Sequence, residues 1–329
     1  MNNPKVSVII PVYGVEKYIE RCARSLFEQT IDSIEYIFID DCTPDNSMKI
    51  LETVMSEYPN RISQVKCHQM DKNSGQAAVR KWGIEHATGE YVIHCDSDDW
   101  MEKDMYKEMY LLAKENNYDI VRCDFIREFK DYQRRNVQLP TNIYSDKYSL
   151  MSKTLLGNEL TSLCDKLVKR VLIQDSRIRY PNNNMQEDHV LTLQYMFYST
   201  SIGYINKPFY HYCYNPTSIT RKIRPEMSIA RMEQVYNNTL MIQAFLEDNE
   251  LDRELNAELI VQKYNCRNHI RDIINKKIYY KKWKSIFPEI DKKILLIKKI
   301  PIRVKLDYIL VKLGIYHIIH NLYSKIKHA

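Results

Sequence analysis

The sequence predicts an α/β fold: a Rossmann-like, mostly parallel sheet flanked by helices and followed by a C-terminal helical extension. Three observations lead to this prediction. Short β-branched runs alternate with segments of helical periodicity through about the first 125 residues. Several of these runs end in acidic residues. From Pro225 onward, apolar residues recur at helical spacing along nearly the whole chain.

The first part of the chain contains strand and helix patterns in regular alternation. The predicted strands cover residues 5–13, 34–41, 61–70 and 90–96, and the predicted helices cover 16–30, 46–58 and 75–87. In open parallel sheets the ligand binds beyond the carboxyl ends of the strands. Residues at those ends therefore have the strongest claim to function.

The alternation becomes weaker after about residue 125. We expect a polar loop at 127–146, helices at 147–157, 161–173 and 190–199, a loop at 175–189, and two short strands at 201–205 and 209–215. The chain then divides into a predicted α/β domain over residues 1–222 and a helical, basic region over 223–329.

Composition and charge favour a globular protein that works in the cytoplasm. The chain has 329 residues, of which 44% are hydrophobic and 27% charged. The N-terminus has no signal-peptide pattern, and no apolar run approaches the roughly 20 residues needed to cross a bilayer. Eight cysteines without a C-x-x-C pair fit reduced thiols better than a zinc site or a disulfide framework.

The net charge of +6 is unevenly distributed. Residues 261–329 contain 17 Lys and Arg against 4 Asp and Glu, so the remainder of the chain is acidic overall. The C-terminal helices could dock on anionic lipid, or they could form an ordinary appendage with its basic face in water. Nucleic acid is a weaker partner, because no nucleic-acid motif accompanies the charge.

Two acidic groups follow predicted strands: Asp40 and Asp41, and the stretch "DSDD" from Asp96 to Asp99. A short D-x-D string alone favours a solvated turn, but its position at a strand end, shared with a second acidic pair, favours a ligand site. No G-x-G-x-x-G follows the first strand and no P-loop motif is present. A Mg²⁺ or Mn²⁺ ion held by carboxylates could bind a diphosphate instead.

Four motifs in order carry a family resemblance: "VSVIIPVYGVEKYIERCARSLFEQT", "EYIFIDDCTPDNS", "NSGQAAVRKWGIEHATGEYVIHCDSDDW" and "QEDHVL". Together they resemble the nucleotide-sugar-dependent glycosyltransferases of family 2, which have the GT-A fold. The resemblance covers about residues 4–220. It implies an inverting transfer of a hexosyl or N-acetylhexosaminyl group from a nucleoside diphosphate sugar, usually a UDP-sugar, to an acceptor hydroxyl.

The resemblance also implies which residues hold the donor. The nucleotide-sugar ligands would be Pro11, Val12, Tyr13, Glu16, Asp41, Gly75, Arg80, Asp96 and Ser97. Tyr13 can stack on a base while Asp41 accepts from an imide N–H, although Tyr13 could equally be a core residue. Arg80 could face the phosphates or serve as a structural ion-pair partner. The family's "DDGSTD" appears as "DDCTPD", with Cys42 in place of glycine.

For the metal, the resemblance points to Asp98, with Asp96 and His211 as further candidates. His211, Ser218 and Arg221 belong to a segment that resembles the loop closing over the diphosphate in this family. A hydrogen-bonded scaffold role for His211 remains an alternative. The implied cofactor is Mn²⁺ or Mg²⁺, whose charge would offset the repulsion among the carboxylates.

The catalytic base is expected in the "ED" motif, Glu187-Asp188. Direct displacement at an anomeric carbon requires a carboxylate that takes the acceptor's proton, and we assign that role to Asp188. Capping of the helix that follows is an alternative or additional role for this residue.

The expected partners are a nucleotide-sugar donor and a glycan or lipid-linked saccharide acceptor, as in surface polysaccharide synthesis, at the inner face of the cell membrane if the C-terminal helices bind lipid. Two other functions stay open: a nucleotidyltransferase, disfavoured by the missing phosphate loop, and a catalytically silent nucleotide-sugar-binding protein, disfavoured by the presence of both acidic motifs.

Overall fold

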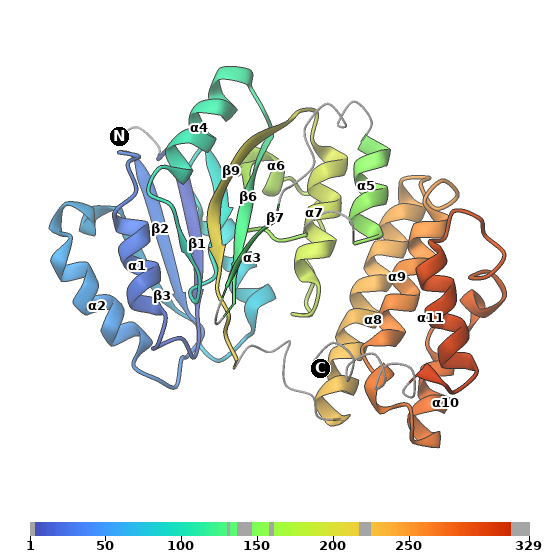
Figure 1. The fold of residues 1–329 in the computed structure, drawn as a ribbon. Helices are drawn as coiled ribbons and strands as arrows, with labels where there is room; N and C mark the ends of the chain where they lie inside the picture. The colour runs from blue at the N-terminus through green and yellow to red at the C-terminus, as the bar shows by residue number, and fades with distance from the viewer. Residues whose placement is uncertain (1–3, 130–131, 137–146, 158–160, 217–224, 317–329) are drawn as a thin grey trace. The chain divides into compact units, whose positions relative to one another are not determined.

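A computed structural model describes residues 4–129, 132–136, 147–157, 161–216 and 225–316 (Figure 1). Contacts within the chain divide it into two compact units, residues 1–218 and 219–329. The predicted boundary between residues 222 and 223 lies outside the described residues, so it stays a prediction.

The first unit is built on one mixed sheet. Its strands among the described residues are β1 (Val6–Val12), β2 (Ile34–Asp40), β3 (Val65–Gln69), β4 (Tyr91–His94), β5 (Trp100–Met101), β6 (Ile120–Glu128), β7 (Gln133–Asn136), β8 (Lys166–Lys169) and β9 (Ile202–Tyr212). They lie in the order β3-β2-β1-β4-β8-β6-β9-β5, and β7 pairs with β6. The first four strands run parallel, as predicted. Beyond them β8 is antiparallel to both of its neighbours.

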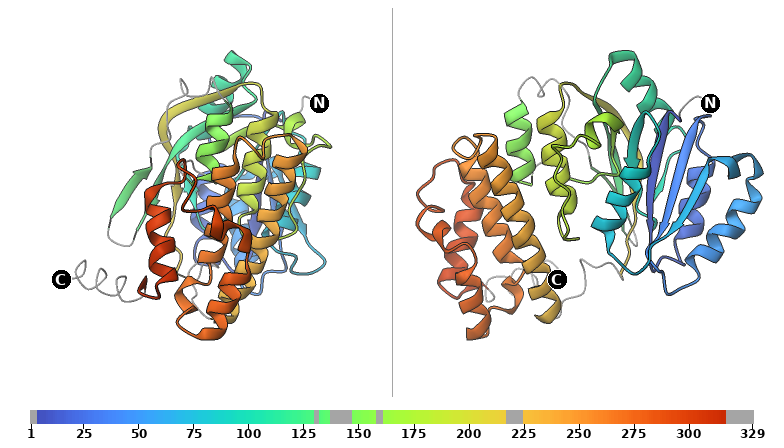
Figure 2. Two further views of the ribbon diagram at one scale, coloured as in Figure 1. Left: turned by 90° about the vertical axis from the view of Figure 1, so that its right-hand side faces the viewer. Right: turned by 180° about the vertical axis from the view of Figure 1, so that it is seen from behind.

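Alternation along the strands directs side chains to two cores. In β1, Val8, Ile10 and Val12 lie in one core and Ile9 lies in the other. The first core is covered by α1 (Ile19–Phe27), α2 (Ser47–Glu57) and α4 (Met105–Asn116). The second is covered by α3 (Gln76–His86), α6 (Arg170–Ile173) and α7 (Glu187–Tyr198), and α5 (Lys147–Leu155) packs against α7 (Figures 1 and 2).

Several predicted elements differ from the observed ones. The predicted strand 61–70 begins as a 3₁₀ turn, η1 (Pro59–Gln64), because Pro59 fixes its backbone in a helical conformation. The predicted helix 161–173 contains strand β8 followed by the short α6, since pairing with β4 and β6 outweighs local helical spacing. The two predicted strands at 201–205 and 209–215 form one strand, β9. Part of the predicted loop 127–146 is the β6–β7 hairpin.

The second unit is helical, as predicted. It contains α8 (Pro225–Asp248), α9 (Asn256–Asn268), α10 (Lys277–Ser285) and α11 (Ile302–Lys312), with 3₁₀ turns η3 (Arg271–Ile273) and η4 (Pro288–Lys292). The buried Arg267 on α9 donates to the carbonyls of Ile286 (2.6 Å) and Phe287 (2.8 Å) and pairs with Asp291 (2.6 Å). This satisfies the backbone of the turn that follows α10. Within the described residues, no helix has the length and apolar character that spanning a membrane requires.

Candidate active site

The acidic stretch from Asp96 to Asp99 follows β4, and a hydrogen bond from Ser97 holds it to β1. The Ser97 hydroxyl, which is buried, donates to the Pro11 carbonyl at 2.6 Å. The N–H of Asp96 donates to the hydroxyl of Tyr210 on β9 at 3.2 Å. Ser97 and the Pro11 carbonyl, both predicted to contact nucleotide, are thus bonded to each other and hold the turn at the carboxyl end of the sheet.

Asp99 ties the same turn to the end of β9. Its carboxylate accepts from the Tyr210 hydroxyl and from the N–H of Cys213, each at 2.7 Å. Burial, with the charges of Asp98 and Asp96, raises the pKa of Asp99 well above its usual value. Asp99 is therefore a buried anchor, whereas Asp96 and Asp98 are half-buried.

Asp98 is half-buried. Its Oδ2 accepts from the side-chain amide of Asn215 at 2.9 Å. Burial and the neighbouring Asp96 raise the pKa of Asp98. Oxygen ligands of this kind suit Mg²⁺ and Mn²⁺, and a cation would offset the repulsion between the two carboxylates. Asp98 and Asp96 therefore offer carboxylate oxygens of the type such an ion prefers, although no group of three or more His, Cys, Asp or Glu side chains within the described residues is arranged to hold a metal ion.

Arg80 connects the two acidic motifs. Its guanidinium is buried, and it pairs through Nη2 with Asp96 at 2.6 Å and through Nη1 with Glu187 at 2.5 Å. Burial alone would lower the pKa of Arg80, but Asp96 and Glu187 raise it. Of the two roles open from the sequence, the ion-pair role is the one observed, with both carboxylates within hydrogen-bond distance of the guanidinium.

Glu187 and Asp188 begin α7, three residues before the predicted start of this helix. Glu187 is buried against Arg80, whereas Asp188 is half-buried. The Asp188 carboxylate accepts from the N–H of His189 at 2.8 Å and from the Thr161 hydroxyl at 3.4 Å. Asp188 lies in the first turn and Gln186 occupies the N-cap position, so the capping role considered for Asp188 is not observed. The positive end of the helix dipole favours the Asp188 anion.

The start of α3 is closed by side chains of this chain. Asp41 accepts from the N–H groups of Ser74 (2.6 Å) and Gly75 (2.8 Å), and Asn184 accepts from the N–H of Ala77 (3.0 Å). A Cβ on Gly75 would lie 2.2 Å from the Asn184 amide nitrogen, and its φ of +82° also favours glycine. Gly75 thus permits the close approach of the Asn184 side chain.

The end of β1 presents Tyr13 to solvent. Tyr13 is 50% exposed, which excludes the alternative of a core residue and leaves its ring accessible to a base. Val12 is different, because its side chain is fully buried in the first core and its carbonyl accepts from the N–H of Asp41. Glu16 is exposed and accepts from the backbone of Asn46 at 3.3 Å, just before α2. Glu16 thus stabilises the start of that helix.

The turn that departs from the family pattern keeps a glycine-like backbone. Cys42 has a φ of +56°, the left-handed region that glycine favours. Its thiol donates to the Met70 carbonyl at 3.0 Å. Asp40 accepts from the N–H of Thr43 at 2.7 Å, which holds the turn in place.

The prediction that His211 joins the metal ligands is not supported. The β5–β9 register places His211 opposite Trp100, and the two rings stack at 3.5 Å between centroids. Both ring nitrogens lie near glutamates, Nε2 at 3.0 Å from Glu102 and Nδ1 at 3.3 Å from Glu128. The scaffold alternative describes this residue, and the neighbour of Asp98 is Asn215 instead. Ser218 and Arg221 lie outside the described residues.

Sequence reasoning missed Tyr210, Asn215 and Asn184. The motif segments pointed to the regions around "YHYCYN" and "NNNMQED" but not to these side chains. Each acts on a residue more than 100 positions away in the chain, so no local spacing identifies it.

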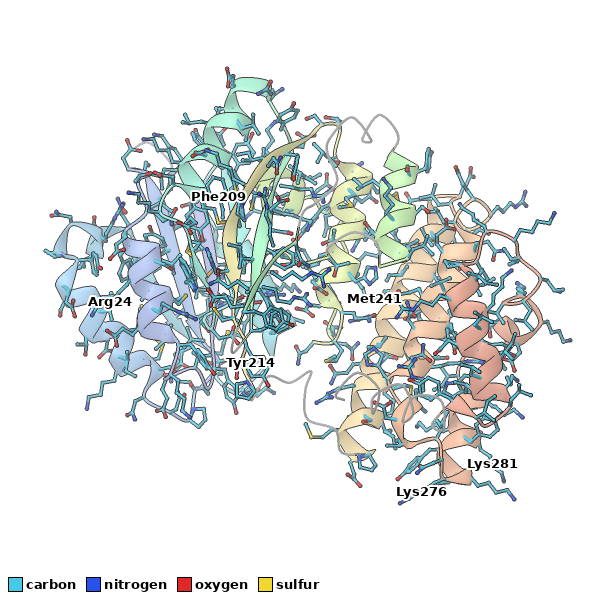
Figure 3. All side chains as sticks on the ribbon, viewed as in Figure 1. Arg24, Phe209, Tyr214, Met241, Lys276 and Lys281 are labelled. Atoms are coloured by element: carbon cyan, nitrogen blue, oxygen red, sulfur yellow. The ribbon has the colours of Figure 1, made fainter. Side chains whose placement is uncertain are left out.

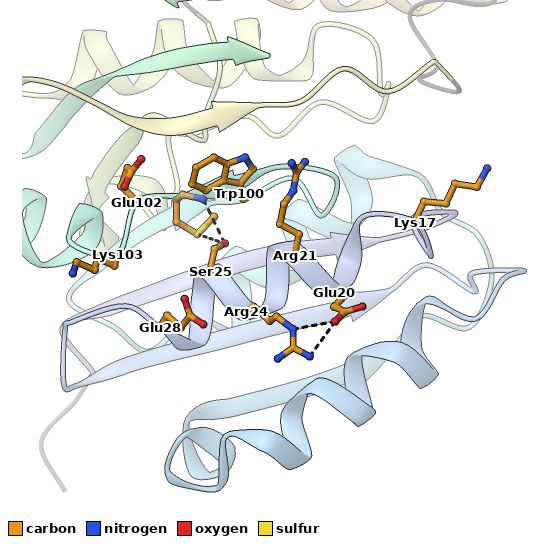
Figure 4. Close-up of a pocket in the computed structure, with 10 residues that line it drawn as sticks. Lys17, Glu20, Arg21, Arg24, Ser25, Glu28, Trp100, Glu102 and Lys103 are labelled. Atoms are coloured by element: carbon orange, nitrogen blue, oxygen red, sulfur yellow. Dashed lines mark hydrogen bonds and ion pairs between the residues drawn. The ribbon is translucent and has the colours of Figure 1, made fainter. Parts of the chain in front are cut away.

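A cavity of about 690 Å³ lies between α1 and β5 (Figure 4). Trp100 and Met101 form its apolar part, and residues of both charges form the rest: Lys17, Glu20, Arg21, Arg24, Glu28, Glu102 and Lys103. Arg24 is paired with Glu20 and with Glu57. None of the predicted site residues lines this cavity.

Comparison with known proteins identifies the family of this chain. Residues 7–190 match the sequence model of glycosyl transferase family 2, and the chain belongs to that family. It is 30% identical over 271 residues to the putative glycosyltransferase EpsH of Bacillus subtilis, covering 81% of this chain and 77% of EpsH. It is 28% identical over 214 residues to the poly(ribitol-phosphate) β-N-acetylglucosaminyltransferase TarS of Staphylococcus aureus, covering 63% of this chain and 35% of TarS.

Solved structures show the same fold at low sequence identity. The structure of S. aureus TarS 1–349 in complex with UDP-GlcNAc has a TM-score of 0.55 at 20% identity, with 81% of each chain covered. The mannosyltransferase PcManGT from Pyrobaculum calidifontis, in complex with GDP-Man and Mn²⁺, has a TM-score of 0.54 at 16% identity, covering 82% of this chain and 73% of PcManGT. The predicted GT-A-type fold with a helical C-terminal region is confirmed.

The burial of Glu187 predicts a pH-dependent stability. Burial raises the pKa of this carboxyl, against the opposing effect of Arg80. An acid whose pKa is raised in the folded state stabilises the fold below its unfolded pKa, and this contribution is lost as pH rises through the folded pKa. Glu187→Gln should therefore flatten the fall in unfolding free energy between pH 5 and pH 9 by about 1 kcal/mol or more.

Urea denaturation across this pH range checks the prediction. The control is Glu85→Gln on α3, an exposed carboxyl beside Lys81 whose removal should leave the pH profile as in the unmodified protein. Equal profiles for Glu187→Gln and the unmodified protein would show that burial of Glu187 does not govern this dependence.

Proposed function

We propose that this protein is an inverting glycosyltransferase that moves a sugar from a nucleoside diphosphate sugar, a UDP-sugar in our proposal, to the hydroxyl of a growing glycan. The observation that carries the proposal is the Arg80 bridge, which joins Asp96 of the D-x-D motif to Glu187 beside Asp188. A donor-binding carboxylate pair and a candidate base thereby share one site.

In the proposed reaction Asp188 is the general base. Its carboxylate is half-buried at the start of α7, where the helix dipole favours the anion. The acceptor hydroxyl attacks the anomeric carbon as its proton passes to Asp188, and the bond from that carbon to the diphosphate oxygen breaks. One displacement from the face opposite the leaving group inverts the anomeric configuration. Glu187 remains paired with Arg80 and holds the first turn of α7 in position.

Asp98 and Asp96 would hold a Mn²⁺ or Mg²⁺ ion. When bound, this ion would neutralise charge on the leaving diphosphate. The carboxylate oxygens of Asp98 and Asp96 support this assignment, as does the Mn²⁺ named with PcManGT. Asp96 is held by Arg80 and by the amide of Gln76 at 3.2 Å, and Asp98 accepts from the amide of Asn215 at 2.9 Å.

For the donor, the exposed ring of Tyr13 supports base stacking at the end of β1. We propose a hexosyl or N-acetylhexosaminyl group, the second type being the one named for TarS. The acceptor would be a glycan or a lipid-linked saccharide, as in surface polysaccharide synthesis, and the protein would work at the cytoplasmic face of the cell membrane. A nucleotidyltransferase or a catalytically silent protein is less favoured, because neither needs a base beside the donor site.

Donor binding is tested by a thermal-shift screen of UDP-, GDP- and dTDP-sugars with and without Mn²⁺. A ligand at 100 times its Kd stabilises the folded state by about 2.7 kcal/mol, so the correct donor with metal should raise Tm by several degrees. Asp98→Ala should abolish the metal-dependent part of this shift, while Asp32→Ala, an exposed carboxyl paired with Lys5, should keep it. No shift with any nucleotide sugar and metal would contradict the proposal.

The base is tested by Asp188→Asn. This change keeps the size of the side chain but removes its ability to accept a proton, so transfer should fall by about 10²–10⁴-fold while nucleotide affinity stays unchanged. The matched control is Asp175→Asn, a residue paired with Arg177 outside the site. Turnover measured by release of the nucleoside diphosphate decides the question, and normal turnover in Asp188→Asn would remove the base assignment.

A further inference from the structure

Helix α11 carries an apolar stripe on its exposed side. Ile302, Leu306, Ile309 and Leu313 are 71%, 53%, 36% and 65% exposed. Their spacing of four, three and four residues places them along one face of the helix. We call these four residues the α11 stripe. Large aliphatic side chains aligned in this way are a continuous apolar surface rather than scattered exposed residues.

The α11 stripe is not the face by which the helix packs in its own unit. Tyr308 and Val311 are the buried residues of α11. The Tyr308 ring lies 5.9 Å from that of Tyr264 and 6.3 Å from that of Trp283, between centroids. Tyr308 and Val311 lie on the opposite side of the helix from the stripe. Helix α11 therefore has two apolar faces. Tyr308 and Val311 pack in the core of the second unit, and the α11 stripe lies outside that core.

Positive charge surrounds the α11 stripe. Residues 274–316 contain twelve Lys and Arg against three Asp and Glu. Arg303 and Lys305 lie on α11 beside the stripe, and Lys298 and Lys299 precede the helix. Lysines also project from α10, among them Lys281, with Lys276 just before that helix (Figure 3).

The few acids of this region are already paired. Asp291 pairs with Arg267 and Lys312 at 2.6 and 2.7 Å. Asp307, the acid on α11, accepts from the Tyr264 hydroxyl at 2.6 Å and lies 3.2 Å from Arg271. Glu289 pairs with Lys263 at 2.6 Å. The field near the stripe is therefore positive, which sets the chemistry of any partner.

We propose that α11 is an interfacial membrane anchor that lies parallel to an anionic lipid surface. The α11 stripe enters the boundary between headgroups and acyl chains, and Arg303, Lys305 and Lys298 contact anionic headgroups, whereas Lys299 is paired with Glu258 at 2.6 Å. The aliphatic side chains match the acyl boundary, and the flanking cations match the anionic headgroups. A second copy would bring like charges together, and a nucleic acid would leave the aliphatic side chains exposed to water.

In the proposed function, a lipid-linked acceptor lies at the same membrane surface. The link between lipid binding and catalysis therefore rests on the proposed function, whereas lipid binding itself does not. Asp188→Asn, which should lose transfer, should bind vesicles like the unmodified protein. Vesicle binding and transfer therefore fail separately.

The test is co-sedimentation of the full chain with phosphatidylcholine vesicles with and without phosphatidylglycerol. We expect binding to the anionic vesicles, weakened by salt, and little binding to the neutral ones. Leu306→Glu combined with Leu313→Glu should reduce binding to anionic vesicles by about tenfold or more, since both side chains leave the acyl boundary and gain negative charge. The matched control is Leu111→Glu on α4, where the leucine is 54% exposed in the other unit.

Circular dichroism and light scattering on the same proteins complete the test. The double variant changes exposed residues only, so its helical signal and Tm should stay unchanged. Failure of the unmodified chain to bind anionic vesicles, or equal binding by the double variant, would overturn the proposal. Self-association of the unmodified chain that the double variant loses would assign the stripe to a second copy and would also overturn it.

Discussion

The candidate site depends on one buried cation, the guanidinium of Arg80 between Asp96 and Glu187. A buried charge is tolerated only when it is paired and hydrogen-bonded, so Arg80 requires both carboxylates close by. Asp96 follows β4 and Glu187 begins α7, so this requirement draws together two motifs that are distant in the chain. Removing both carboxylates would leave the buried guanidinium without a counter-charge.

The same pairing divides the work among the acidic residues. Asp96, Asp99 and Glu187 are held by Arg80, Tyr210 and backbone groups, and they fix the geometry. Asp98 and Asp188 keep half-buried carboxylates, which suit contact with metal and with acceptor. Each motif therefore combines an anchored carboxylate with an accessible one.

Much of the fold could be predicted because it depends on local periodicity. The alternating runs of β1, β2 and β4 and the helical spacing of α1 to α3 are present in short windows of sequence. The strand within 161–173 was missed because β8 forms by pairing with β4 and β6, and local propensity carries no information about such partners.

The site could be predicted to the level of motifs but not of contacts. Asp98 and Asp188 could be proposed because they lie in short acidic motifs that resemble those of the family, whereas Arg80 is paired with a residue 107 positions away. The surroundings of His211 could not be predicted because the β5–β9 register, which the sequence does not reveal, places it against Trp100. Tyr13 could be resolved only by its exposure.

The measurement that tests the Arg80 bridge most directly is a double-mutant cycle of unfolding free energies for Asp96→Asn and Glu187→Gln, repeated in an Arg80→Met background. With Arg80 present, the double variant should lose about 1 kcal/mol or more beyond the sum of the single losses, because the second change leaves a buried guanidinium without any counter-charge. This coupling should vanish in the Arg80→Met background. Additive losses with Arg80 present would contradict the claim that Arg80 joins the two halves of the site.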